Sequence, residues 1–186
     1  MILLAITPGW GFDRGAWKPV LRAGVDALLI REYALGARAL LEATRWCQDT
    51  APDVGLWVAG RLDVALAAGC GLHAPEAYPA VRSGQMPLSR PLHAESQWDA
   101  RCGASQLLIS PVFPSPRKGA PWGGPRLHTF LDGLPAEGPR LLALGGVTPA
   151  LAANLHHPRL AGLAAIRPFW DGDPETAVSR FRAAWA

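Results

Sequence analysis

LISPVFPSPRKGAPWGG, residues 108–124, is the stretch that decides how the rest of the chain is interpreted. The apolar run that opens it predicts a strand buried on both faces, as in a parallel sheet. The loop that follows contains Arg117 and Lys118 between four prolines, each of which fixes φ and makes the loop stiff. A buried strand that leads into a stiff basic loop is typical of an anion site on an α/β scaffold. The alternative is an ordinary exposed loop whose charges are solvated.

The same strand-then-loop pattern recurs along the whole chain, and a helical segment follows each strand. The predicted strands are 1–6, 25–30, 54–59, 71–73, 85–92, 105–110, 140–144 and 160–166. The predicted helices are 17–23, 34–50, 62–68, 75–82, 94–102, 126–131, 149–155 and 174–185. Strands that alternate with helices require a parallel sheet with right-handed crossovers, and eight such units close into a (β/α)₈ TIM barrel.

The length of the chain constrains this barrel. With 186 residues, against roughly 250 in a typical barrel, several helices must be only one or two turns long. We therefore predict one compact (β/α)₈ domain over residues 1–186. A doubly wound open sheet is the structural alternative.

Composition narrows the class of protein. The chain is 49% hydrophobic and 18% charged, with a net charge of +3 and arginines that are scattered singly, which argues against nucleic acid as a partner. Its three cysteines have no CxxC spacing and are typical of structural thiols in a reducing compartment. The opening segment lacks a basic region, and no apolar run is long enough for a membrane span. We expect a cytoplasmic protein without a membrane partner.

The carboxyl ends of the strands are where such barrels carry their chemistry. Paired glycines, Gly145 and Gly146, follow the seventh strand, and Ile166 and Arg167 follow the eighth. Paired glycines leave backbone N–H groups accessible, and the loops after strands seven and eight often hold phosphate. The alternative for a bare glycine pair is a tight turn.

Five segments give the chain a specific resemblance. They are LLAITPG (3–9), LLIREYALGARALL (28–41), GRLDVALAAGCGLH (60–73), SPVFPSPRKGAP (110–121) and LALGGVTPALAANL (142–155). Together they resemble the thiamine phosphate synthase and TenI superfamily of small (β/α)₈ proteins, over nearly the whole chain.

The resemblance implies a role for individual residues. Gly145 and Gly146, with the backbone at Ile166 and Arg167, would hold the phosphate of a thiazole phosphate. Ser115 and Lys118 would lie on the loop that meets the pyrophosphate of the pyrimidine substrate in the synthase. Arg31 and Arg61 match further substrate-binding positions of the family.

Several positions depart from both branches of the superfamily. The two aspartates that bind Mg²⁺ in the synthase are replaced by Gly60 and by Ala77 or Tyr78, neither of which offers carboxylate oxygen. Pro111 stands where the TenI tautomerase has its histidine. A proton would then have to be moved by another imidazole, and His93 is the candidate catalytic residue, with His73 as a weaker one. The alternative for either is a structural histidine.

The resemblance thus implies a TenI-like protein that binds a thiazole phosphate and acts as a thiazole tautomerase, an isomerase, without a cofactor or metal. One alternative is a thiamine phosphate synthase, a transferase that would place Mg²⁺ through Glu76 or substrate oxygens. Another is a non-catalytic binding or regulatory protein. The expected partner is a small phosphorylated molecule, and the chain could also form a homodimer. We further expect one or two of Trp10, Trp122 and Trp170 to stack on the bound heterocycle.

Overall fold

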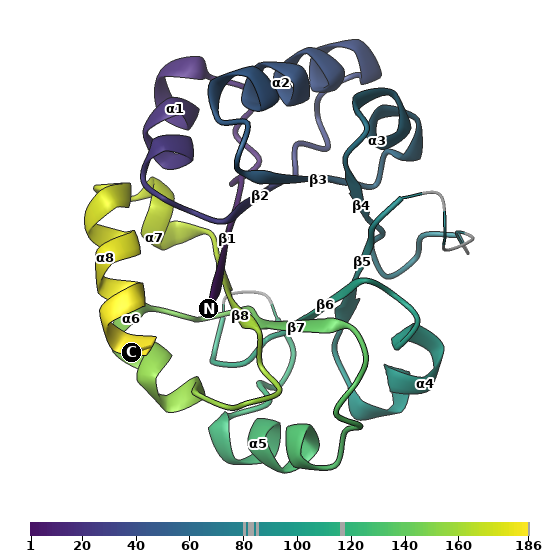
Figure 1. The fold of residues 1–186 in the computed structure, drawn as a ribbon, viewed down its shortest axis with the longest axis vertical. Coiled ribbons are helices and arrows are strands. Elements are labelled where there is room, and N and C mark those ends of the chain that lie inside the picture. The colour runs from purple at the N-terminus through teal and green to yellow at the C-terminus, as the bar shows by residue number, and fades with distance from the viewer. Residues whose placement is uncertain (80, 82–83, 85, 116–117, 186) are drawn as a thin grey trace.

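The computed structural model describes residues 1–79, 81, 84, 86–115 and 118–185. Its strands form a closed parallel barrel in chain order, in which the last strand pairs with the first (Figure 1). The strands are β1 (Ile2–Ile6), β2 (Ala27–Ile30), β3 (Gly55–Ala59), β4 (Gly71–His73), β5 (Leu88–Leu92), β6 (Gln106–Ile109), β7 (Arg140–Ala143) and β8 (Gly162–Ala165). This confirms the predicted (β/α)₈ barrel and excludes the open sheet.

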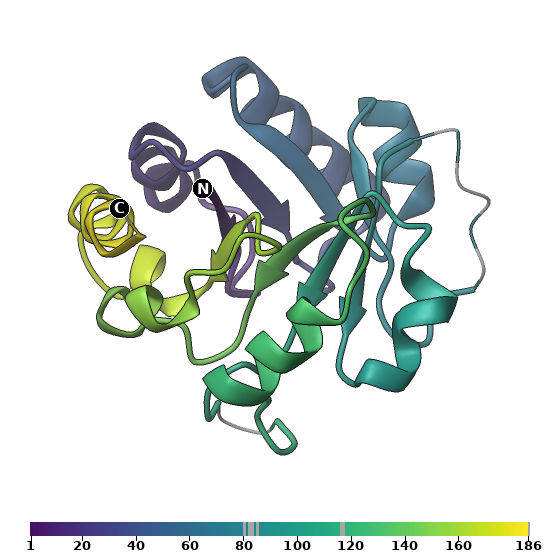
Figure 2. The same cartoon turned by 60° about the horizontal axis from the view of Figure 1, so that its bottom comes forward.

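Helices surround the barrel on its outside (Figure 1), and the parallel strands carry the loops that follow them to one end (Figure 2). The helices are α1 (Arg14–Arg22), α2 (Ala37–Thr50), α3 (Leu62–Ala68), η1 (Glu95–Gln97), α4 (Trp98–Arg101), α5 (Gly124–Asp132), α6 (Pro149–Ala152), η2 (Ala153–Leu155), α7 (Arg167–Trp170) and α8 (Pro174–Trp185). Most are short, as the length of the chain requires.

Two layers of apolar side chains hold the barrel together. A small inner cluster includes Leu4, Leu29, Leu108 and Leu142, and a larger cluster fills the space between strands and helices. Because side chains alternate between the two faces of each strand, both layers draw on the same continuous apolar runs. This explains why those runs do not alternate with polar residues.

One predicted helix is not found in the described residues, and one observed helix is not predicted by the sequence. The described part of 75–82 forms a turn at 76–77 and no helix, while residues 80 and 82 lie outside the described residues. The sequence does not predict the short helix α7, because a four-residue segment is too short to show a helical period and Pro168 lies in its first turn.

Among the described residues, no helix is both long and apolar enough to cross a membrane.

Candidate functional site

An open cavity of about 890 Å³ lies between the loops after β7 and β8 and the start of α8. It brings together five residues that the sequence predicts for phosphate or substrate binding. These are Ser115, Gly145, Gly146, Ile166 and Arg167. They come from three different loops, so the barrel itself creates this grouping.

The turn after β7 is tied to the loop after β6. The Val112 N–H donates to the Leu144 carbonyl and the Phe113 N–H to the Gly145 carbonyl, both at 2.9 Å. The loop then returns to its own start, where Trp122 N–H donates to the Pro111 carbonyl at 2.9 Å. Backbone contacts of this kind fix the position of Ser115 relative to the glycine pair.

The two glycines also permit a close approach that no side chain would allow. Gly145 and Gly146 have φ angles of +92° and +65°, which other residues rarely adopt. A Cβ at Gly146 would lie 2.7 Å from the Phe113 Cβ and from the Pro114 carbonyl oxygen. The glycine pair is therefore required by the fold of the turn itself.

Several backbone amides beside the cavity have no partner in the part of the chain that the structure describes. The N–H groups of Gly145, Gly146, Ile166 and Arg167 donate to no other residue among those that the structure describes. Unpaired amides beside an open cavity are suited to bind the oxygens of an anion.

Charged groups of both signs line the side of the cavity formed by α7 and α8. Arg167 and Arg180 are exposed there, beside Asp171 and Asp173. Asp173 caps α8, since its carboxylate accepts the Thr176 N–H at 2.8 Å. Hydrogen bonds with Thr176 hold the pKa of Asp173 below its ordinary value. The Asp173 carboxylate is thus already hydrogen-bonded to the start of α8. The guanidinium of Arg167, in contrast, is exposed.

Three further predicted residues lie outside this cavity. Arg31 follows β2, and its guanidinium lies over the Tyr33 ring, 5.4 Å from the centroid. Arg61 pairs with Asp63 at 2.6 Å at the start of α3. Lys118 is exposed on the same loop as Ser115, and Arg117 lies outside the described residues. The structure places these three cations on the segments that follow β2, β3 and β6, outside the residues that line the cavity.

His93 follows β5 and is partly exposed, with 36% of its side chain accessible. Its Nδ1 lies 2.7 Å from the Ser110 carbonyl oxygen, and its Nε2 lies 3.6 Å from Glu76 Oε2. No pattern in the sequence predicts this contact with Glu76, because the two residues belong to different loops. His93 does not line the cavity that holds the glycine pair.

His73, in contrast, is a buried residue whose Nδ1 lies 2.9 Å from the Ser89 hydroxyl. Burial, followed by the charges of Arg31, His93 and Arg90, lowers its pKa to about 4. The structural alternative for His73 is therefore the one that the structure favours.

This shifted pKa predicts a pH-dependent stability. Between about pH 6.5, where an unfolded histidine titrates, and about pH 4, the unfolded chain binds a proton at His73 that the folded chain does not. The free energy of unfolding should therefore decrease as the pH is lowered through this window, by on the order of 3 kcal/mol in total. His73→Gln should remove that part of the slope in urea unfolding measured at several pH values. Parallel slopes in both proteins would contradict the assignment.

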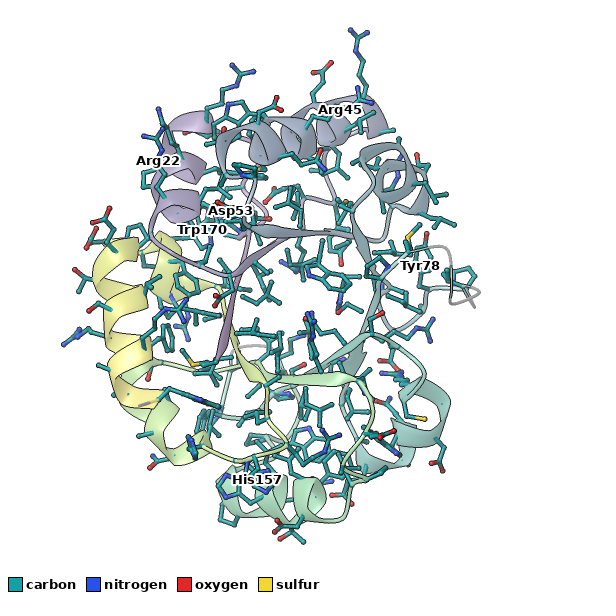
Figure 3. All side chains as sticks on the ribbon, viewed as in Figure 1. Arg22, Arg45, Asp53, Tyr78, His157 and Trp170 are labelled. Carbon is teal, nitrogen blue, oxygen red and sulfur yellow. The ribbon has the colours of Figure 1, made fainter. Side chains whose placement is uncertain are left out.

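The three candidate tryptophans have different surroundings. Trp122 is buried against Phe130, with ring centroids 5.0 Å apart. Trp170 donates from Nε1 to the Ile6 carbonyl at 2.8 Å and lies inside the helix layer near α1 (Figure 3). Trp10 is 72% exposed. Packing accounts for the first two, so only Trp10 is left to contact a ligand.

Trp10 lies at the tip of a braced turn. The buried Glu32 carboxylate accepts the N–H groups of Gly9 at 3.0 Å and Gly11 at 2.7 Å, on either side of it. We predict that Trp10→Phe removes any fluorescence change caused by thiazole phosphate, because stacking would alter that indole first. Trp170→Phe is the matched control and should keep the change. A full response in Trp10→Phe would rule out contact at this position.

The residues near the expected metal positions do not fit Mg²⁺. Gly60 and Ala77 carry no donor side chain, and the Tyr78 hydroxyl accepts the Leu62 N–H at 3.3 Å on the outer side of β4 (Figure 3). Glu76 is already paired with Arg101. Across the described residues, no three or more His, Cys, Asp or Glu are grouped so that they could hold a metal ion. A hard dication needs several oxygen ligands, which this region does not supply.

No protein-family model and no curated protein matches the chain in sequence. Solved structures match it in fold. Thiamine phosphate pyrophosphorylase from Pyrococcus furiosus has a TM-score of 0.84 at 18% identity, over 98% of this chain and 94% of that one. The enzyme of the same name from Bacteroides thetaiotaomicron has a TM-score of 0.74 at 12% identity, over 99% and 97%.

A third structure, 3-hexulose-6-phosphate synthase from Salmonella typhimurium, has a TM-score of 0.69 at 11% identity, over 100% of this chain and 98% of that one. At such low identities, these similarities show the fold alone. The chain has the compact (β/α)₈ barrel fold that thiamine phosphate pyrophosphorylases and 3-hexulose-6-phosphate synthase share.

Proposed function

We propose that this protein binds a thiazole phosphate at the carboxyl end of its barrel and isomerises it as a thiazole tautomerase of the TenI type. The observation that carries the proposal is the cavity beside Gly145, Gly146, Ile166 and Arg167, where backbone amides that have no partner among the described residues lie next to an exposed guanidinium. Phosphate oxygens are the ligand that such amides and an arginine suit best.

Tautomerisation fits the residues present. It moves a proton within one substrate and needs neither a metal nor an oxidant. His93 is the proposed acid–base residue, since an imidazole can both give and take a proton near neutral pH. Arg31 and Lys118 are the proposed partners of further negative charge on the ligand, and Arg61 is available for this only if it leaves Asp63.

Thermal unfolding in the presence of candidate ligands tests the proposal. Thiazole phosphate at about 100 times its Kd should stabilise the protein by about 2.7 kcal/mol, and the size of this effect should not depend on Mg²⁺. The unphosphorylated thiazole alcohol is the control and should have little effect. If only a sugar phosphate raised the melting temperature, the thiazole assignment would be wrong.

The two alternatives make different predictions. A synthase would form thiamine phosphate from thiazole phosphate and the pyrimidine pyrophosphate only with Mg²⁺, and pyrimidine pyrophosphate would then also stabilise the protein. A non-catalytic binder would be stabilised by thiazole phosphate but would turn over neither substrate. Turnover of the thiazole carboxylate phosphate tautomer alone supports the tautomerase.

A further inference from the structure

Trp10 and Glu32 both depart from the usual pattern of burial. Trp10 is 72% exposed, while Glu32 is only 2% exposed. A glutamate is rarely buried without a partner of opposite charge, and none of the ion pairs in the described part of the chain includes Glu32. Neither placement is one that folding alone favours. Departures of this kind are expected where a protein has a function to serve.

The Glu32 carboxylate holds the Trp10 turn, residues 9–11, by its backbone. Its Oε1 accepts the Gly9 N–H at 3.0 Å, and its Oε2 accepts the Gly11 N–H at 2.7 Å. The two glycines have φ angles of +91° and +92°, so the chain turns sharply on either side of Trp10. A carboxylate suits this role because both of its oxygens accept and neither donates. One side chain therefore fixes the backbone on both sides of the indole.

The segments on either side of the Trp10 turn are anchored as well. Before the turn, the Ile6 carbonyl accepts from Trp170 Nε1 at 2.8 Å. After the turn, the Phe12 ring packs edge-on against the Trp17 ring, with centroids 5.0 Å apart. Phe12 thus joins the packing between the helices, whereas Trp10, two residues earlier, is held outside it.

The Trp10 turn begins beside the cavity that holds the glycine pair. Pro8, the residue before the turn, lines that cavity together with Arg167 and Pro168 of α7. Because β1 pairs with β8, the segments that follow these two strands lie next to each other. Two residues span at most about 7 Å, so the backbone of Trp10 lies within that distance of Pro8. Trp10 therefore stands at the rim of the cavity, with its side chain exposed.

We infer that Glu32 is a positioning residue, which holds the Trp10 indole at the rim of the cavity as one wall for the heterocycle of the ligand. The inference rests on the proposed function, since it takes the phosphate to be held by the amides of Gly145 and Gly146. Stacking requires a broad aromatic face in a fixed orientation, which an indole on an anchored turn supplies. Glu32 itself does not touch the ligand and acts only through Trp10.

A double-mutant cycle tests whether Glu32 acts through Trp10. In Glu32→Gln, the new amide nitrogen faces one of the two N–H groups, so one hydrogen bond is lost and two donors are brought together. In calorimetric titrations of the full-length protein, Glu32→Gln and Trp10→Ala should each weaken the binding of thiazole phosphate on the order of 10-fold. The double variant should bind no more weakly than Trp10→Ala. Effects that multiply, or an unchanged affinity in Glu32→Gln, would overturn the inference.

Inorganic phosphate separates positioning from a general loss of structure. Since it has no ring to stack, its affinity should be the same in the unmodified protein, in Glu32→Gln and in Trp10→Ala. If Glu32→Gln weakened the binding of both ligands equally, Glu32 would be a structural residue and the inference would be wrong, while the proposed function would stand. An unmodified protein that binds neither ligand would contradict the proposed function itself.

Asp26→Asn is the matched control for the loss of a carboxylate between β1 and β2. Asp26 Oδ2 accepts the Leu3 N–H at 2.7 Å, at the end of β1 remote from Trp10, and pairs with Arg182 at 3.1 Å. Its replacement should lower the stability of the protein and leave the affinity for thiazole phosphate unchanged. Weaker binding in this control would attribute the effect of Glu32→Gln to lost stability and contradict the inference.

Gly11→Ala alters the same turn without replacing Glu32, and it takes the place of Glu32→Gln if that variant does not fold. The φ of +92° at Gly11 strains any side chain, although a Cβ there would meet no atom within 4 Å. The variant should fold, shift the Trp10 turn and bind thiazole phosphate more weakly, with no change for inorganic phosphate. Full affinity for thiazole phosphate in Gly11→Ala would contradict the role given to the turn.

Discussion

Replacing Gly162 with alanine is expected to prevent the barrel from closing. A Cβ at this position would lie 1.9 Å from the Ile2 carbonyl oxygen and 2.7 Å from the Ile2 nitrogen. These are backbone atoms of β1, whose pairing with β8 closes the sheet, so they cannot move aside as a flexible side chain would. We expect a loss of about 4 kcal/mol or more, at the extreme of what single substitutions do.

Urea unfolding and the yield of soluble protein would measure this loss. Gly103→Ala is the matched control, since a Cβ there would meet no atom within 4 Å and φ lies outside the left-handed region. It should unfold close to the unmodified protein. Equal stability of the two variants would show that β1 and β8 do not meet as closely as described.

Replacing Gly146 with valine should abolish the binding of thiazole phosphate while the barrel still forms. The new Cβ would clash with Phe113 and with the Pro114 carbonyl, and valine is strained at a φ of +65°. The turn after β7 would have to move away from the loop after β6, and its amides would move with it. We expect affinity to fall by on the order of 100-fold or more, which corresponds to about 2.7 kcal/mol.

Calorimetric titration with thiazole phosphate would measure the change. Gly69→Ala is the control for backbone strain alone, because Gly69 has the same φ of +65° but no atom within 4 Å of a new Cβ, and it lies away from the cavity. It should lose stability and keep its affinity. Unchanged binding in Gly146→Val would refute this placement of the phosphate.

The strands were readily predicted because burial on both faces leaves an unmistakable apolar run. The predicted bounds of β4, 71–73, are the observed ones, and those predicted for β7 differ by one residue at its end. The start of β5 was harder to place, because Arg90 and Pro91 interrupt its apolar pattern. The described part of 75–82 lacks the helical turn expected after β4, since proline at a first position suits a helix but does not produce one without an apolar face to bury.

Some features of the candidate site can likewise be predicted from the sequence, and others cannot. The grouping of Gly145 with Arg167 follows from the barrel, because loops after adjacent strands emerge side by side. The contact of Glu76 with Arg101 and His93 depends on the path of three loops, which no local pattern in the sequence encodes. The packing of Trp122 and Trp170 cannot be predicted from the sequence either, since a buried tryptophan and a ligand-binding one can both follow the end of a strand.

The most direct test of the central claim is the position of phosphorus in a crystal grown with thiazole phosphate and a metal chelator. The account predicts that the phosphate lies in the cavity against the amides of the turn at Gly145 and Gly146 and those at Ile166 and Arg167, with no metal beside it. A phosphate bound at another face, or one that appears only when Mg²⁺ is supplied, would contradict it.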